Sequence, residues 1–179
     1  MNEQEKVCAI FAADPMEFPW GYDEEAEDCI LMKQKLNEYI DRLTKDGYLR
    51  FHAAMDNGFG LYAAEYILAL RREDPRLFLC CYLPGEDQAT KWTPEHRERY
   101  FNALAGASEV VTVSAEDSFV RDYDVRFAAG DMAQVIIVVT ASIMTDSPTE
   151  QAKRDLYIRY EKELIEIDQV YGVHRHEAW

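Results

Sequence analysis

The chain has 179 residues, of which 48% are hydrophobic and 30% are charged, a composition typical of one ordered globular domain. Its 34 acidic residues outnumber its 19 Lys and Arg residues, so the formal net charge is -15 and the averaged field repels nucleic-acid backbones and anionic lipids. We therefore expect neither a general nucleic-acid partner nor a membrane partner.

The first half of the chain alternates apolar runs with segments of helical periodicity. Val7 to Ala13 is a continuous apolar run that ends at Asp14-Pro15, which indicates a strand buried on both faces. Apolar residues then recur at helical spacing from Asp23 to Lys45, and Asp46-Gly47 ends this helix. The same alternation predicts a strand from Tyr48 to Ala54, a helix from Gly58 to Arg72 and a strand from Leu77 to Leu83.

The second half continues this alternation. Thr93-Pro94 combines an N-cap residue with a first-turn proline and opens a helix that runs to about Leu104. The later elements predicted from periodicity are a strand Val110 to Val113, a partly helical stretch from Ala115 to about Ala129, a strand Val135 to Thr140, a helix from about Pro148 to Lys162 and a short strand Leu164 to Ile167.

Strands that alternate with helices of ten residues or more require right-handed crossovers and give a parallel sheet covered on both faces. The predicted fold class is therefore α/β, a Rossmann-like doubly wound, mainly parallel sheet of five or six strands with helices on both faces. We expect residues 1–168 to form one domain and residues 169–179 to form a polar, frayed C-terminal tail.

The cysteines and histidines show no spacing typical of a metal or redox site. The pair Cys80-Cys81 lies inside an apolar run, and the chain has no C-x-x-C motif, so we expect reduced cysteines in the core. His52, His96, His174 and His176 lack partners at zinc-site spacing. We expect no metal and no cofactor. The acidic N-terminus and the short first apolar run do not form a signal peptide or a membrane span, which predicts a cytoplasmic protein.

Several segments near the carboxyl ends of the predicted strands resemble a known family. They are Pro19-Trp20-Gly21-Tyr22-Asp23-Glu24-Glu25, Met55, Gly58, Ala63-Ala64-Glu65, the stretch around Gln88, Lys91-Trp92, Glu95, Arg97-Glu98-Arg99-Tyr100, and Ala107 to Ser114. In this order they resemble the YpsA-like branch of the SLOG superfamily over roughly residues 7 to 140. The resemblance implies a Rossmann-like fold that binds a nucleotide or a nucleotide-derived molecule at the ligand edge of the sheet.

The resemblance and the local chemistry together predict a set of site residues. Glu65, about five residues into a helix, is a candidate general acid/base or acceptor for a ribose hydroxyl, although a helix dipole also favours a carboxylate there. Arg126 matches an arginine that family members carry ahead of the fifth strand, and it is the candidate anion binder. Gly58 would border the site, and the aromatic rings that could stack on a base are Trp20, Tyr22 and Trp92.

The chain also departs from the family pattern where phosphate would bind. Ala12-Ala13-Asp14 stands where the family has Gly-His-Arg, and Ala53-Ala54 stands where it has Ser-Gly. The family aspartate falls at Gly60, and the Gly-Gly-Thr turn has no counterpart around Ala152-Lys153-Arg154. A phosphate beside Asp14 would meet repulsion in place of a charge-assisted hydrogen bond. These departures favour an altered ligand, or none, over catalysis.

Three functions remain open at this point. The first is a divergent, non-catalytic protein that binds a nucleotide-derived small molecule. The second is a hydrolase of the N-glycosidic bond of a nucleoside phosphate, in which Glu65 assists the reaction and Arg126 steers phosphate. The third is a scaffold without ligand, for example a homodimer through the Leu61 to Leu70 helix. A strand-end cleft filled by Phe11, Phe59 or Asp14 would favour this scaffold function. Asp14, Asp56 and Asp131 give only a weak indication of a cation site.

Overall fold

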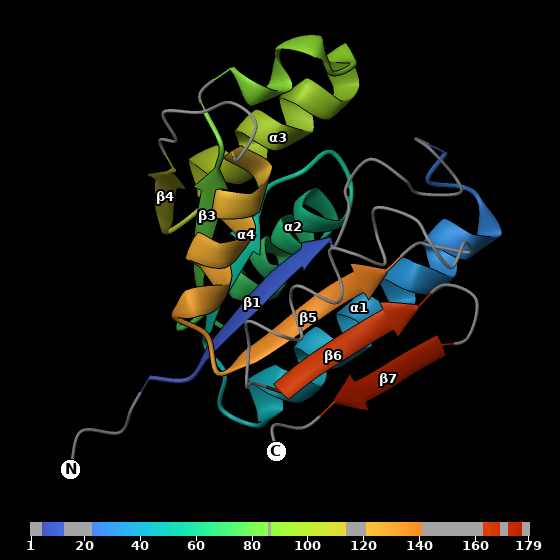
Figure 1. Cartoon of the computed structure of the whole chain (residues 1–179), viewed down its shortest axis with the longest axis vertical. Helices are drawn as coiled ribbons and strands as arrows, with labels where there is room; N and C mark the ends of the chain where they lie inside the picture. Colours follow the sequence, from blue (N-terminus) through green and yellow to red (C-terminus); the bar gives the residue numbers. More distant parts are fainter. Residues whose placement is uncertain are drawn as a thin grey trace.

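The protein folds into a single seven-stranded sheet with helices on both faces, as seen in a computed structural model (Figure 1). The structure describes residues 5–12, 23–85, 87–113, 121–140, 163–168 and 172–176. The strands are β1 Val7–Ala12, β2 Arg50–Ala54, β3 Phe78–Leu83, β4 Glu109–Thr112, β5 Val135–Thr140, β6 Glu163–Asp168 and β7 Gly172–His176. The helices are α1 Glu27–Lys45, α2 Phe59–Arg71, the 3-10 helix η1 Gln88–Lys91, α3 Pro94–Gly106 and α4 Arg121–Asp131.

The order of the strands in the sheet is β4-β3-β2-β1-β5-β6-β7. The first six strands of the chain are parallel to one another, and β7 pairs antiparallel with β6. β1 lies in the middle, where Ala9 pairs with His52 of β2 on one side and with Ile136 of β5 on the other. The strand order reverses at β1, because the chain first proceeds outward through β2, β3 and β4 and then returns to β5. Such a reversal marks the usual ligand edge of a parallel sheet.

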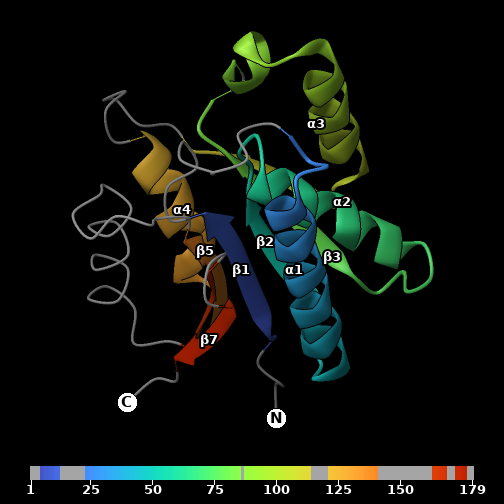
Figure 2. The same ribbon diagram turned by 90° about the vertical axis from the view of Figure 1, so that its right-hand side faces the viewer.

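Each face of the sheet has its own hydrophobic core. One core lies under α1 and α2, with α3 beside α2, and includes Ile10, Leu36 and Ile67. The other lies under α4 and includes Phe11 and Val125 (Figure 2). The alternation along β1, in which Ile10 faces α1 and α2 while Phe11 faces α4, follows from the two-residue period of a strand. Burial of each large apolar side chain contributes roughly 1.5–3 kcal/mol.

The main predictions of fold are confirmed. The parallel α/β sheet, its two covered faces and its strand positions agree with the sequence pattern, and the four cysteines are free thiols in the interior. η1 was not predicted. The stretch from Ala115 to about Ala129 that was predicted to be partly helical contains most of α4, and residues 115–120 lie outside the described residues. The expectation of a frayed tail is wrong for residues 172–176, because β7 pairs with β6 there. The predicted helix from Pro148 to Lys162 lies outside the described residues.

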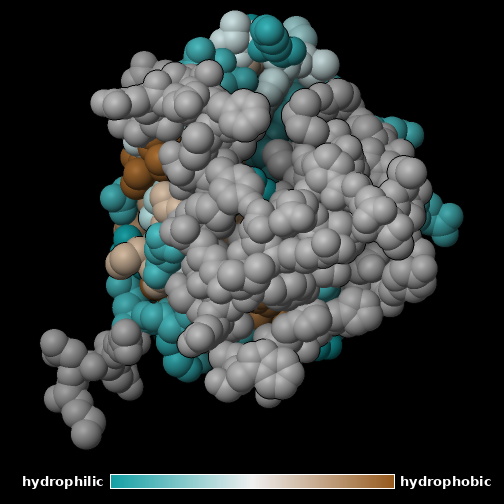
Figure 3. Space-filling model, viewed as in Figure 1, coloured by the Kyte–Doolittle hydropathy of each residue, from teal (hydrophilic) through white to brown (hydrophobic). Residues whose placement is uncertain are grey.

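The Leu61 to Leu70 helix does not offer the apolar face that a homodimer through it would need. In α2 the side chains of Leu61, Ala64 and Ile67 are fully buried against the sheet and α1. Their burial within the chain corrects the prediction of this particular dimer surface. Hydrophobic surface in the view of Figure 3 gathers instead over β4, the edge strand on which Val110 is 43% exposed. Within the part of the chain that the structure describes, no helix combines the length and apolar character needed to cross a membrane.

Candidate functional site

A small cleft opens at the carboxyl ends of β1 and β2, on the face of the sheet that α4 covers. It has a volume of about 50 Å³. Its described walls come from the ends of β1, β2 and β3, from η1 and from α4, and are formed by Phe11, Ala12, Ala54, Met55, Asp56, Pro84, Gln88, Val125 and Arg126. Phe11 lines the cleft without filling it. The cleft therefore lies beside the reversal of strand order, where a ligand of this fold class binds.

Asp56 lies at the junction between β2 and α2 and faces this cleft. Its Oδ1 accepts a hydrogen bond of 2.9 Å from the backbone N–H of Gly60. An acceptor at this place satisfies one of the free amides in the first turn of a helix and interacts favourably with the helix dipole. The start of α2 thus has a carboxylate of the chain itself as its anionic partner.

Gly60 allows β2 and α2 to approach one another closely. A Cβ atom at this position would lie 2.0 Å from the carbonyl oxygen of Ala54, much closer than van der Waals contact. Since the obstacle is backbone rather than a flexible side chain, a residue other than glycine would force the strand and the helix apart. The family aspartate that aligns with Gly60 therefore has no room in this chain.

Two further polar side chains, Gln88 and Arg126, line the cleft together with Asp56. The amide of Gln88 donates a hydrogen bond to the carbonyl oxygen of Met55, and its oxygen accepts one of 3.3 Å from the Tyr100 hydroxyl. Gln88 is thus held in one orientation by the backbone just after β2 and by α3. Arg126 of α4 is 9% exposed and places a guanidinium group at the cleft. The lining combines a fixed acceptor, a fixed amide and a cation with apolar surface.

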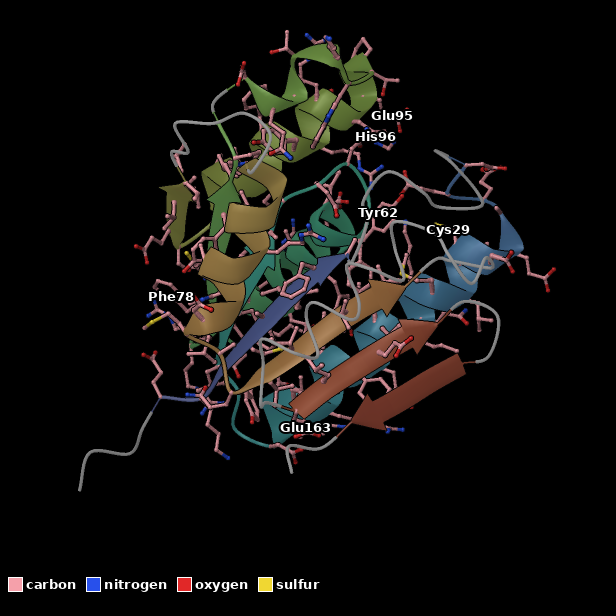
Figure 4. All side chains as sticks on the ribbon, viewed as in Figure 1. Cys29, Tyr62, Phe78, Glu95, His96 and Glu163 are labelled. Carbon is pink, nitrogen blue, oxygen red and sulfur yellow. The ribbon has the colours of Figure 1, made fainter. Side chains whose placement is uncertain are left out.

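An ion-pair network, formed by Glu24, Lys33, Glu65, His96 and Arg99, lies behind the β2–α2 junction, between α1, α2 and α3. Arg99 donates to Glu24 at 2.5 Å and to Glu65 at 2.6 Å, and Lys33 donates to Glu24 at 2.6 Å. The Nε2 of His96 lies 3.3 Å from Glu24. Figure 4 shows His96 of α3 and Tyr62 of α2 at this end of the molecule, toward the carboxyl ends of the strands. The network ties together three segments that are far apart in the sequence.

The charges of the network determine the protonation of Glu24. Burial alone raises the pKa of this carboxyl group, but the hydrogen bonds and charges of Arg99 and Lys33 outweigh it and lower the pKa to about 2. The two carboxylates that bind Arg99 raise its pKa in turn. Glu24 and Arg99 are therefore both charged at neutral pH. The network also supports the cleft, because Asn57, the neighbour of Asp56, has its Oδ1 2.5 Å from the Nδ1 of His96.

The structure separates the residues that the sequence assigned to one site. Arg126 lines the cleft, and Gly58 is the N-cap of α2, two residues after Asp56. Glu65 is absent from the described cleft lining, and its carboxylate binds Arg99 on the other face of the sheet. The ring of Trp92 packs edge-on against Tyr100, with 4.9 Å between centroids. Trp20 and Tyr22 lie outside the described residues.

Sequence reasoning missed the roles of Asp56 and Gln88 in the cleft. An available signal for Asp56 was its position after a buried strand and four residues before Gly60, at the start of a helix. Asp131, which was grouped with Asp56 as a weak cation site, is the last residue of α4, and Asp14 lies outside the described residues. Across the residues that the structure describes, no group of three or more His, Cys, Asp or Glu side chains could hold a metal ion.

Comparisons with known proteins agree with the resemblance seen in the sequence. A family model described as the YspA SLOG family, YpsA, matches residues 14–128, more than half of the chain. A UPF0398 protein of Bacillus pumilus (strain SAFR-032) is 29% identical over 110 residues, which cover 61% of this chain and 58% of that protein. The similarity thus spans less than two thirds of this relative. The region matched by the family model contains β2, α2, β3 and α3. It therefore includes the β2–α2 junction and the ion-pair network.

Proposed function

Since the chain belongs to the YspA SLOG family, we propose that it binds a nucleotide-derived small molecule in the cleft at the carboxyl ends of β1 and β2, as a binding protein and not as an enzyme. The observation that carries this proposal is the position of the cleft. It lies beside the reversal of strand order, and ligands of open parallel sheets bind at that place.

The chemistry of the lining supports a ligand with an apolar ring and polar groups. Phe11, Ala54 and Val125 provide apolar surface for a base, and the guanidinium group of Arg126 provides donors for a phosphate or carbonyl oxygen. The volume of about 50 Å³ is smaller than the roughly 300–1,000 Å³ of complete small-molecule pockets. A nucleotide-derived ligand would therefore place one part in this cleft and extend beyond its described walls.

The position of Glu65 supports binding rather than hydrolysis. A general acid or base must reach the reacting group directly or through one water molecule. Both oxygens of Glu65 bind Arg99, at 3.1 Å and 2.6 Å, and Glu65 lies outside the described lining of the cleft. The carboxylate that does face the cleft, Asp56, is hydrogen-bonded to the start of α2. The hydrolase alternative thus lacks the acid/base group on which it was based.

A thermal-shift screen tests this proposal. The purified chain is titrated with nucleosides, nucleoside monophosphates and ADP-ribose, since a ligand that binds only the folded state raises the apparent stability by about 2.7 kcal/mol at 100 times its Kd. For a chain of this length this corresponds to a rise in Tm of about 5–10 °C. Arg126→Met, which removes the charge but keeps the volume, should abolish the shift.

The matched control is Arg97→Met, which replaces an arginine of α3 that lies away from the cleft. This variant should leave the ligand-induced shift in Tm unchanged. The ligand-free Tm of each variant shows whether the substitution itself disturbs the fold. Absence of any shift at millimolar ligand, or an undiminished shift in Arg126→Met, would contradict the proposal.

A further inference from the structure

The cleft also indicates which part of the ligand it recognises. We propose, on the basis of the function proposed above, that Asp56 accepts hydrogen bonds from the nucleoside part of the ligand and that the start of α2 admits no phosphate. Asp56 is then a specificity-determining residue that selects neutral donor groups, namely sugar hydroxyls or base amines, over anions.

The anion position at the start of α2 is already occupied. In many α/β proteins the first-turn amides of the helix after a strand bind a ligand phosphate. Here the Gly60 amide donates to the Asp56 carboxylate at 2.9 Å. The first turn itself, from Phe59 to Tyr62, carries no acidic residue, so Asp56 is its anionic partner. A phosphate at this position would have to displace a covalently tethered carboxylate.

The same junction also lacks space for a phosphate. An added Cβ on Gly60 would lie 2.0 Å from the carbonyl oxygen of Ala54, so even a methyl group does not fit between the end of β2 and the start of α2. A phosphate is larger than a methyl group. Loops that bind phosphate instead hold several amide groups around an open concave space. The close approach at Gly60 is therefore incompatible with a phosphate site on that side of the helix.

The charges and hydrogen-bonding groups of the cleft also favour a nucleoside over a phosphate. Asp56 presents a carboxylate, an acceptor, whereas Arg126 on α4 presents only donors. A phosphate is anionic at neutral pH, so the Asp56 carboxylate would repel it. A sugar hydroxyl can donate to Asp56, and a base edge carries both donors and acceptors. A group with both kinds of polar atom is complementary to both of these side chains in a cleft of about 50 Å³.

Asp56→Asn tests this inference while keeping an acceptor for the Gly60 amide, because the side-chain oxygen of Asn can accept the same hydrogen bond. Isothermal titration measures the Kd of adenosine, guanosine, cytidine and uridine and of inorganic phosphate for the wild type and the variant. A hydrogen bond to a charged acceptor contributes about 10- to 100-fold in affinity, so the variant should bind the preferred nucleoside more weakly by that factor. Its affinity for inorganic phosphate should rise.

The control is Asp74→Asn, which also removes one carboxylate but lies in the loop after α2, where it binds Arg76. It should change neither affinity. If nucleosides or nucleotides bind in a manner that depends on Arg126 but Asp56→Asn leaves nucleoside affinity unchanged, the role of Asp56 is wrong while the proposed function stands. If no nucleoside, nucleotide or ADP-ribose binds the wild type, the proposed function fails and the role of Asp56 fails with it.

Discussion

Replacement of Arg99 by alanine tests the ion-pair network. Arg99 donates four hydrogen bonds, two to Glu24 and two to Glu65. An exposed ion pair contributes up to about 1 kcal/mol, and removal of one partner from a fully buried pair costs about 3–5 kcal/mol. The side chains of Arg99 and Glu24 are 23% and 21% exposed, between these limits. We therefore expect Arg99→Ala to lower the free energy of unfolding by about 2 kcal/mol, and Tm by about 4–8 °C.

Urea denaturation at pH 7 measures this loss, with Arg97→Ala as the control in the same helix. Arg97 makes no ion pair with the described residues, so its replacement should cost less than about 0.5 kcal/mol. The loss should also depend on pH. The pKa of Glu24 is lowered from 4.5 to about 2, so the stability that its charge contributes is present above pH 4.5 and is lost as the pH falls toward 2. Equal losses in the two variants, or a difference that does not shrink at low pH, would refute the argument.

Three other perturbations follow from the packing. Gly60→Ala should cost at least about 3 kcal/mol in chemical denaturation, because the new Cβ would meet the Ala54 carbonyl oxygen at 2.0 Å. Burial and the nearby Arg50 charge lower the pKa of His52, so below about pH 6.5 this histidine binds a proton more readily in the unfolded chain than in the folded one. The free energy of unfolding should therefore fall from pH 7 to pH 5.5, and it should fall less in His52→Gln. Tyr66→Phe removes a 2.7 Å hydrogen bond to an Asp carboxylate of α1 and should cost about 1–2 kcal/mol in urea denaturation.

Each of these has a result that would contradict it. Gly106→Ala is the control for Gly60→Ala, because its Cβ would meet only a flexible Leu68 methyl group at 3.2 Å, and equal losses would show that the β2–α2 contact is not restrictive. An identical pH dependence in wild type and His52→Gln would assign the pH effect to other groups. An unchanged stability in Tyr66→Phe would mean that solvent replaces the lost hydrogen bond at no cost.

The fold was accessible from the sequence because its signal is local. Each buried parallel strand is a short apolar run, such as Val135 to Thr140, and each exposed helix face has a regular period. β7 was missed for the same reason: the sequence Gly-Val-His-Arg-His from Gly172 to His176 has a single large apolar residue. Its pairing with β6 depends on an edge that becomes available only when the sheet has formed.

The candidate site was less accessible because it depends on contacts between distant segments. The sequence placed Glu65 near the ligand edge but gave no sign that its partner would be Arg99, 34 positions later. Helical spacing shows which side of α2 bears a carboxylate, whereas the packing of α3 on α2 decides which cation meets it. Likewise, the close approach at Gly60 depends on the exact distance between β2 and α2, which periodicity does not specify.

The measurement that tests the central claim most directly is the location of the bound ligand. Amide chemical shifts are followed by two-dimensional NMR while the most stabilising compound of the thermal-shift screen is added. The account predicts saturable changes that are largest at the cleft, in Ala12, Asp56 and Gln88. Changes concentrated in the pocket of about 290 Å³ between the end of α1 and β6, lined by Arg42 and Ile165, would contradict it.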